Sequence, residues 1–465
     1  MSTMRLYIET FGCQMNERDS EIMAQLLGAH AYLPTSTLEH ADLVVINTCS
    51  IRGKAAQKAY SSFGRFRKLK EKKPGLIVAV AGCVAQQDGD DLLTRMPFLD
   101  IVLGPQSIYT LPQLVERVRQ TGRPVVATEL TSDFIIPPFL PDLARGEPHK
   151  RFVTIMQGCD NFCTYCVVPY TRGREISRAF EDILAEVRHL ADNGVREITL
   201  LGQNVNSYGR DRRGASVHTF PELLRAVAGI AGVERLRFTT SHPKDLSEEL
   251  MRCFAELPNL CPHFHLPVQS GSNAVLKRMN RKYTVEEYLD KVERLLSFRP
   301  DIALATDIIV GFPGETDADF DATMRLMEEV RYHGAFSFKY SDRPNAKAAV
   351  FADKVDEEVK SARLAHLQAR QEAISLERRQ ELVGRVVEVM VDGRSSKAEG
   401  RQQWNARTDT NQVVNFPSPE HLAPGRIVSV YIEEACRNSL RGRLAIHEDT
   451  LANTANKMKT GDCQP

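Results

Sequence analysis

Three cysteines share one short segment of the chain. Cys159, Cys163 and Cys166 form a C-x3-C-x2-C run directly after the apolar segment 152–157. Zinc usually takes four ligands, with a second cysteine or histidine pair at some distance, and no such pair is evident in the sequence. A 4Fe-4S cluster usually takes four thiolates, so three leave one iron open for a small molecule. The spacing favours such a cluster over two alternatives, a zinc loop with a distant fourth ligand or three buried free thiols.

A second set of cysteines is spread along the first part of the chain. Cys13, Cys49 and Cys83 have 35 and 33 residues between them, and each follows an apolar run and precedes a helical stretch. The runs are 6–10, 43–46 and 76–80. Such runs predict parallel strands buried on both faces, whose carboxyl ends share one ligand-binding edge. One cysteine there would indicate core packing, but three in register predict a second three-cysteine cluster, again with one open iron.

The other four cysteines show no ligand spacing. Cys253 lies in the amphipathic stretch 246–257 and is predicted to be a small core residue, and Cys463 lies in a polar tail. Cys261 and Cys436 are expected to be ordinary thiols as well.

Composition bounds the class of protein. The chain has 465 residues, 42% of them hydrophobic and 26% charged, which excludes disorder throughout and indicates about three domains. Lys plus Arg and Asp plus Glu total 60 each, so no global basic field marks a nucleic-acid partner. The N-terminus lacks a signal-peptide pattern, and no run of 18 apolar residues occurs. We expect a soluble, cytoplasmic α/β protein that binds no membrane.

The elements needed to position these cysteines fall into three regions. Residues 1–130 are predicted to form an open parallel α/β sheet, with further strands at 100–103 and 124–128, and a Pro-rich linker follows at 136–142. Residues 145–378 are predicted to form a partial (β/α)6 barrel that ends in the charged helix 353–379. Its six strands are expected at 152–157, 197–201, 235–240, 263–268, 302–310 and 335–340, with helices at 181–191, 221–231, 285–298 and 317–332.

The C-terminal region has a different character. Short β-rich runs at 386–391, 413–416 and 427–432 predict a small β-barrel over 380–446. It resembles the TRAM domain, an RNA-binding module of OB-like architecture. The tail, 447–465, is polar and is predicted to be disordered.

The C-x3-C-x-aromatic-C run, with Tyr165 as its aromatic residue, resembles the signature of the radical S-adenosylmethionine (radical SAM) enzymes. In that superfamily the methionine amino and carboxylate groups of SAM chelate the open iron. The resemblance assigns Gly202, Gln203 and Asn204 to the methionine amino group and the Gly311 loop to the adenine, and Ser241 and Gln269 could bond ribose or carboxylate oxygens. Their alternative is ordinary turn structure.

Two further patterns have competing interpretations. Between Arg52 and Lys73, nine basic residues meet a single acid, Glu71, which predicts either a solvated basic helix or a phosphate contact. The segment 169–175 adds basic and aromatic groups where a splayed-out nucleobase could enter. His263 and His265 lie two apart on a strand, and without a third ligand nearby they are predicted to be hydrogen-bonded histidines, not a metal pair.

Over residues 1–446 the chain resembles the methylthiotransferases, and the strings 12–16, 47–52, 158–174 and 201–208 carry this resemblance. One departure is the segment 341–346, where Gly-Thr is expected after Pro344 but Asn345 and Ala346 occur. The departure touches no predicted ligand.

The resemblance implies a mechanism with two clusters. Cys159, Cys163 and Cys166 would hold the cluster that cleaves SAM to a 5′-deoxyadenosyl radical. Cys13, Cys49 and Cys83 would hold an auxiliary 4Fe-4S cluster that carries the sulfur to be methylated by a first SAM. The implied substrate is C2 of N6-isopentenyladenosine next to the anticodon of tRNA. A monomer that receives electrons from a low-potential donor such as a flavodoxin or ferredoxin is expected.

Three alternatives remain. The same chemistry could act on threonylcarbamoyladenosine in tRNA or on an aspartate of a ribosomal protein. A protein of another class would be a non-catalytic iron–sulfur RNA-binding protein, although electron carriers usually saturate their irons. A zinc-binding RNA adaptor would be colourless, whereas an iron–sulfur protein is brown.

Overall fold

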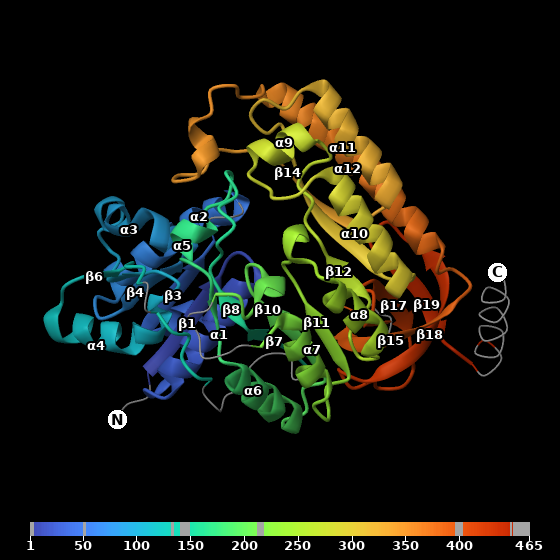
Figure 1. Ribbon diagram of the computed structural model, residues 1–465. Helices are drawn as coiled ribbons and strands as arrows, with labels where there is room; N and C mark the ends of the chain where they lie inside the picture. The colour runs from blue at the N-terminus through green and yellow to red at the C-terminus, as the bar shows by residue number, and fades with distance from the viewer. Residues whose placement is uncertain are drawn as a thin grey trace, which may run out of the picture.

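The computed structural model describes residues 4–49, 53–131, 134–139, 149–211, 218–395, 403–446 and 449, with side chains of residues 53–60 excluded. The predicted tail, Cys463, Arg52, the end of the 136–142 linker and the side chains of Lys54 and Lys58 therefore lie outside the described residues. Among the described helices, none combines the length and apolar character needed to cross a bilayer. Figure 1 shows an N-terminal domain and a small barrel on opposite sides of a central core.

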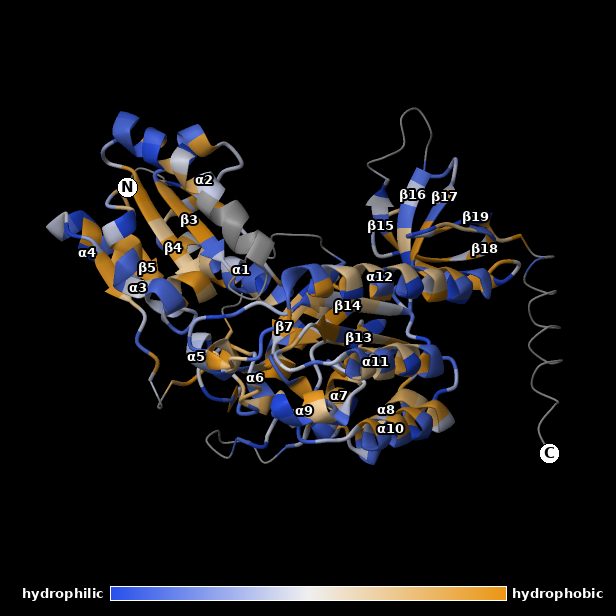
Figure 2. Ribbon diagram, turned by 90° about the horizontal axis from the view of Figure 1, so that it is seen from above, coloured by the Kyte–Doolittle hydropathy of each residue, from blue (hydrophilic) through white to orange (hydrophobic). Residues whose placement is uncertain are grey.

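The N-terminal domain is a six-stranded, all-parallel sheet of order β2-β1-β3-β4-β5-β6, as predicted. Its strands are β1 (Met4–Thr10), β2 (Tyr32–Pro34), β3 (Leu43–Thr48), β4 (Ile77–Gly82), β5 (Ile101–Leu103) and β6 (Val125–Ala127). Its helices are α1 (Gln14–Gly28), α2 (Gly53–Lys72), α3 (Cys83–Arg95) and α4 (Leu111–Thr121). Every residue of β3 and β4 is buried, which is why their sequences are continuous apolar runs. Figure 2 shows these strands in orange among more polar helices.

The edge strand β2 was not predicted. It has only three residues and pairs with the first three residues of β1. Strand order places β2 on one side of β1 and β3 on the other, so the chain reverses its direction of sheet growth between β1 and β3. Such a switch point opens a crevice at the carboxyl ends of the strands, where ligands bind in open α/β sheets.

The central core is a partial barrel of six parallel strands. They are β7 (Lys150–Thr154), β10 (Glu197–Leu201), β11 (Arg235–Phe238), β12 (His263–His265), β13 (Ala303–Val310) and β14 (Gly334–Lys339). They form two three-stranded sheets, β11-β10-β7 and β12-β13-β14, joined by a parallel bridge between Leu236 and Leu260. The helices are α6 (Phe180–Asp192), α7 (Phe220–Ala228), α8 (Glu248–Glu256), α9 (Asn273–Arg278), α10 (Val285–Phe298), α11 (Asp317–Val330) and α12 (Glu357–Gln380).

Several predicted boundaries were wrong. The strand expected over 263–268 ends at His265, and the charged helix expected over 353–379 begins at Glu357. The strand expected over 152–157 ends at Thr154, and its last two residues, β8 (Met156–Gln157), turn away to pair antiparallel with β9 (Ile176–Ser177). The loop between β8 and β9 carries the three cysteines, and the pairing of these strands holds the two ends of the loop together. The helix expected over 221–231 ends at Ala228, because Gly229 follows and caps it.

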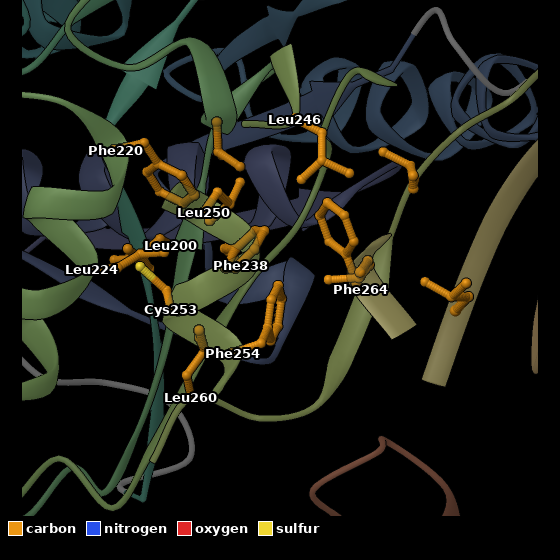
Figure 3. Packing of buried hydrophobic residues seen from close by; sticks show 14 of the residues in the cluster. Leu200, Phe220, Leu224, Phe238, Leu246, Leu250, Cys253, Phe254, Leu260 and Phe264 are labelled. Atoms are coloured by element: carbon orange, nitrogen blue, oxygen red, sulfur yellow. The ribbon is translucent and has the colours of Figure 1, made fainter. Parts of the chain in front are cut away.

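The hydrophobic core of the barrel lies between its strands and helices. Phe220, Phe238 and Phe254 pack together, with ring centroids of neighbouring pairs 5.0 and 5.7 Å apart. Cys253 is fully buried in this cluster, near Leu200 and Leu224 in Figure 3. The prediction that Cys253 is a small core residue is confirmed.

The C-terminal region is a closed five-stranded barrel, as predicted. Its strands are β15 (Val386–Arg394), β16 (Gln403–Thr408), β17 (Val413–Pro417), β18 (Ile427–Ala435) and β19 (Leu440–Leu444). The sequence indicated only β15, β17 and β18. In β16 only Trp404 and Ala406 supply apolar side chains to the barrel interior, and β19 is largely Arg and Gly, so neither has an apolar run.

Backbone carbonyls of this barrel accept hydrogen bonds from the core. Arg235 Nη1 donates to Arg407 O at 2.7 Å, and Arg237 donates to Asp409 O at 2.7 Å and to Thr408 O at 2.9 Å. Arg235 is the first residue of β11, so the turn between β16 and β17 is fixed to the amino-terminal end of the core strands.

Candidate active site

The first cysteine site is a loop at the carboxyl end of β7. Gly158 opens it at φ +81°, and a Cβ there would lie 2.0 Å from Arg174 O, so only glycine fits. Gln203 Oε1 accepts from Gly158 N at 2.6 Å, and Cys159 N donates to Gly173 O at 3.2 Å. Gln203 therefore supports the cluster loop directly, a contact that complements its predicted role at SAM.

The three thiols of this loop are packed closely enough to affect one another. Burial raises the pKa of Cys159 to about 11 and that of Cys166 to about 12, and the neighbouring Cys163 adds to both shifts. Arg281 Nη1 donates to Cys163 Sγ at 3.5 Å. This buried cation compensates gathered thiolates, and no sequence pattern had pointed to it.

No three His, Cys, Asp or Glu side chains in the described ranges stand as a ready site for one metal ion. A 4Fe-4S cluster binds each thiolate through a different iron and so needs more widely spaced ligands than a single ion. Three gathered thiols beside a buried arginine fit a cluster of this kind.

Unpartnered polar atoms lie at the ends of the next two core strands. Asn204 Nδ2 donates to Asp245 Oδ2 at 2.8 Å, but Asn204 Oδ1 and Ser241 Oγ are buried without a hydrogen-bond partner among the described residues. Buried polar groups are normally satisfied, so these two atoms indicate space for a polar ligand. Both had been predicted to contact SAM, and the fit with its polar groups is good.

His242, next to Ser241, was missed by the sequence analysis. Its Nδ1 accepts from Lys244 N at 3.1 Å, which leaves the proton on Nε2, and Nε2 has no partner in the described part of the chain. Burial, together with the positive charge of Arg281, holds the pKa of His242 well below its usual range. The Ser-His-Pro string directly after a core strand is the signal that could have found it.

Of the other residues predicted to contact SAM, Gly202, Gly311 and Gln269 are constrained through their backbones, and Tyr165 makes a side-chain contact. A Cβ on Gly202 would lie 2.5 Å from Met156 Cγ, and one on Gly311, at φ +68°, would lie 2.1 Å from Lys360 Cγ. Gln269, at φ +75°, exchanges backbone hydrogen bonds with β13. Tyr165 lies 3.4 Å from Arg281 through its hydroxyl. Their assignment to SAM stays a prediction.

The second cysteine site lies at the switch point of the N-terminal sheet. Cys13 follows β1, Cys49 follows β3 and Cys83 begins α3 directly after β4. A Cβ on Gly12 would lie 2.3 Å from Cys49 Cβ, so the ends of β1 and β3 approach as closely as glycine permits.

Asn16 organises this edge. It donates to Thr48 O at 2.9 Å and to Phe11 O at 3.1 Å, and its Oδ1 accepts from Cys13 Sγ at 3.5 Å. A hydrogen bond with Cys49, aided by the positive charge of Arg172, lowers the pKa of Cys13 to about 6. Burial raises the pKa of Cys83. The cysteines are therefore brought to one edge, and a loop residue of the core, Arg172, joins them there.

The inner face of the barrel carries exposed aromatic groups. On β14, Phe336 is 56% exposed and Phe338 43% exposed, while Ser337 between them bonds Gln368 of the covering helix α12. Phe336 is in register with Asp307, whose Oδ1 accepts a hydrogen bond from His265 Nε2 at 3.2 Å. The prediction of a hydrogen-bonded histidine is confirmed for His265.

Four of the nine cations in the basic segment 52–73 have acidic partners within their own domain. Arg65 pairs with Glu9 at 2.8 Å, and Lys73 pairs with Asp42 at 2.7 Å. Arg67 and Lys70 also have acidic partners, Glu71 and Asp100. These four cations are therefore poorer candidates for phosphate contact than the sequence alone indicated.

The departure at Asn345 has a simple structural reason. Asn345 has φ +68°, the left-handed conformation that glycine adopts freely and asparagine tolerates better than other residues. Asn345 can therefore adopt the backbone conformation that a glycine at this position would allow.

Family models match three parts of the chain: uncharacterized protein family UPF0004 over residues 5–104, the radical SAM superfamily over 153–327 and the TRAM domain over 380–445. A tRNA-2-methylthio-N(6)-dimethylallyladenosine synthase of Desulfotalea psychrophila is 52% identical, covering 96% of this chain and 99% of that protein. Proteins of the same name from Geotalea uraniireducens and Burkholderia mallei are 52% and 47% identical, each covering at least 94% of this chain and 98% of the relative. The chain belongs to this synthase family.

Solved structures support the fold of the synthase core. The radical S-adenosylmethionine methyltransferase TsrM from Kitasatospora setae superposes with a TM-score of 0.55 at 14% identity, covering 75% of each chain. The cobalamin-dependent S-adenosylmethionine radical enzyme OxsB superposes at 0.50 and 12% identity, covering 79% of this chain and 56% of OxsB. As a member of the radical SAM superfamily, the synthase core uses a 4Fe-4S cluster and SAM.

Proposed function

We propose that this chain methylthiolates C2 of N6-dimethylallyladenosine next to the anticodon of tRNA. The observation that carries the proposal is the pair of separate three-cysteine sites, in a chain 52% identical over nearly its full length to a synthase named for this product. One site alone would suit SAM cleavage. A sulfur insertion needs a second place to hold sulfur, and the N-terminal site supplies it.

The chemistry requires a radical. An aromatic C–H bond such as that at C2 of adenine has no acid–base route at neutral pH. When bound, a 4Fe-4S cluster with an open iron supplies the electron that cleaves SAM at one site and a place for the transferable sulfur at the other. One SAM serves as methyl donor and another as radical source, and an external low-potential donor such as a flavodoxin or ferredoxin supplies the electrons.

The chain's own residues bind and orient these groups. Cys159, Cys163 and Cys166 would hold one cluster, and Cys13, Cys49 and Cys83 the auxiliary one. The unpartnered Asn204 Oδ1 and Ser241 Oγ would accept from or donate to polar groups of SAM at the carboxyl ends of β10 and β11. His242 Nε2, kept protonated while the ring is neutral, would donate to an acceptor oxygen beside them.

Phe336 and Phe338 would receive the modified base. They stand exposed on the face of β14 opposite to the covering helix, and a flipped adenine with an apolar N6 substituent would stack on them. The TRAM barrel would bind another part of the same RNA, at a point distant from the reacting end of the core.

The experiment is nucleoside mass spectrometry of tRNA incubated anaerobically with reconstituted protein, SAM and a low-potential reductant. We expect loss of N6-dimethylallyladenosine with an equal gain of its 2-methylthio derivative. SAM cleavage with unchanged N6-dimethylallyladenosine would contradict the proposal. A 2-methylthio derivative of threonylcarbamoyladenosine would then identify that nucleoside as the substrate, and wholly unchanged tRNA would favour a protein aspartate.

A further inference from the structure

One arginine of the core lies inside the cysteine site of the N-terminal domain. Arg172 follows α5 (Val168–Thr171), a short helix of the core that packs against α3 in Figure 1. Its side chain is 2% exposed. A buried guanidinium is costly unless charge and hydrogen bonds compensate it, so its partners indicate its role.

The contacts of Arg172 lead to the cysteines. Nη2 donates to Asp19 Oδ2 at 2.7 Å and to Asn16 Oδ1 at 3.1 Å. Asn16 Oδ1 also accepts from Cys13 Sγ at 3.5 Å, so one oxygen atom joins the guanidinium to a thiol of the site. Nη1 is buried and makes no hydrogen bond of good geometry among the described residues, while the guanidinium lies close enough to the Cys83 thiol to oppose the rise that burial gives its pKa. An unsatisfied buried donor on a charged group costs more than one on a neutral group, and a bound acceptor would recover that free energy.

A second buried ion pair joins the two domains, and a core arginine extends it. Arg18 of α1 bonds one carboxylate oxygen of Glu186 on α6, and Arg178 of the core bonds the other. Arg18 and Glu186 are nearly as buried as Arg172 and Asp19. Domain contact is therefore secured by other side chains, and it leaves the second amino group of Arg172 unexplained.

We propose that Arg172 is a positioning residue for the group held by Cys13, Cys49 and Cys83: fixed by Asp19, its guanidinium donates from Nη1 to that group and stabilises its reduced form. The inference rests on the proposed function, which places an auxiliary cluster there. A 4Fe-4S cluster on three thiolates gains one negative charge when it accepts one electron. Cluster potentials respond to net charge and to hydrogen bonds at the sulfurs, so a fixed cation raises the potential.

The test isolates the second site. A Cys159→Ala, Cys163→Ala, Cys166→Ala background leaves only the N-terminal set, and the protein is reconstituted with iron and sulfide. Iron content and the midpoint potential, from a dithionite titration followed by electron paramagnetic resonance, are then measured with Arg172→Met added. We expect iron to be retained and the reduction equilibrium to fall at least tenfold, which is about 59 mV for one electron.

Arg18→Met is the matched control, because it removes another buried cation between the two domains without removing Arg172. It should leave the potential unchanged. An equal potential in the Arg172→Met protein, or an equal shift in Arg18→Met, overturns the inference while the proposed function stands. A background protein that binds no iron overturns the proposed function itself.

Asp19→Asn supplies an independent variant if Arg172→Met fails to retain iron. It removes the negative partner of Arg172 and leaves an amide oxygen that can still accept. The freed positive charge should raise the potential, in the direction opposite to Arg172→Met. An unchanged or lower potential in Asp19→Asn overturns the inference.

Discussion

Cys159, Cys163 and Cys166 lie within one eight-residue stretch, whereas Cys13, Cys49 and Cys83 come from the ends of three strands. The first site takes its three cysteines from one loop, although Gln203 and Arg281, which are distant in sequence, contact that loop. The second depends on the order of strands in a whole sheet and on Arg172 from another domain. A local motif brings its three ligands together within one loop, whereas a dispersed motif needs the correct strand order of the whole sheet to do so.

The largest effects should separate the two sites by function. Cys159→Ala should abolish SAM cleavage and retain about half of the iron, because one of two clusters remains. Cys49→Ala should retain SAM cleavage and stop methylthiolation. Iron analysis, 5′-deoxyadenosine formation and nucleoside mass spectrometry measure the three quantities. Methylthiolation by the Cys49→Ala protein would break the division of labour.

A next prediction concerns the glycine beside each site. Gly12 has φ +132°, and a Cβ there would lie 2.3 Å from Cys49 Cβ, so Gly12→Ala should displace the end of β3. Iron should fall to about half with SAM cleavage preserved. Gly158→Ala should show the reverse pattern, with SAM cleavage lost. Gly75→Ala is the control, since nothing lies within 4 Å of its added methyl group and it is exposed.

A smaller effect is expected at Phe336 and Phe338, on which we propose that the modified base stacks. Phe336→Ala and Phe338→Ala should each raise the KM for tRNA about tenfold, because stacking of a base on an aromatic ring contributes ~1–3 kcal/mol. SAM cleavage without tRNA should be unchanged, in contrast to the cysteine and glycine variants. Val350→Ala, at an 84% exposed position, is the control. Unchanged KM values in both phenylalanine variants would place the base elsewhere.

The last effect is on stability alone, with no change expected in activity, and it tests whether the first site depends on groups outside the core. Burial raises the pKa of Glu175 to about 7, and Asp160, Asp245 and Asp211, all of the core, add to the shift. A raised folded-state pKa gives stability that is present below the unfolded value of 4.5 and lost as the pH rises through about 7. Glu175→Gln should therefore exceed the wild type at pH 8 by on the order of 3 kcal/mol in unfolding free energy, and match it near pH 4.

Urea unfolding of the cluster-free protein at the two pH values measures this difference. An advantage of Glu175→Gln that is the same at both values would contradict the shift. Asp19→Asn should leave the Glu175 effect intact, because none of the groups that shift Glu175 belongs to the N-terminal domain.

The sequence predicted the parts of the fold that have strong local patterns. The apolar runs of β3 and β4, the six core strands and the local cysteine motif are examples. It missed β2, β16 and β19. These strands contain few apolar residues, and they are recognisable only by their pairing with neighbouring strands in the assembled sheet or barrel. It also missed Arg281 and His242, and it placed Arg172, within the segment 169–175, where a nucleobase could enter, whereas Arg172 is buried against Asp19. A buried charge or ring becomes significant only when residues distant in sequence surround it. The convergence of Cys13, Cys49 and Cys83 was predictable because parallel strands share an edge.

The hydrogen bonds from Arg235 and Arg237 to the turn of the C-terminal barrel have a geometric consequence. They fix that barrel at the amino-terminal end of the core strands, whereas the cysteine loop follows their carboxyl ends. The two ends of the core are therefore separate points of contact for an RNA. An RNA that contacts both ends must span the length of the core. The modified base would then be selected by the distance between its loop and the part of the RNA bound at the C-terminal barrel, as well as by its chemistry.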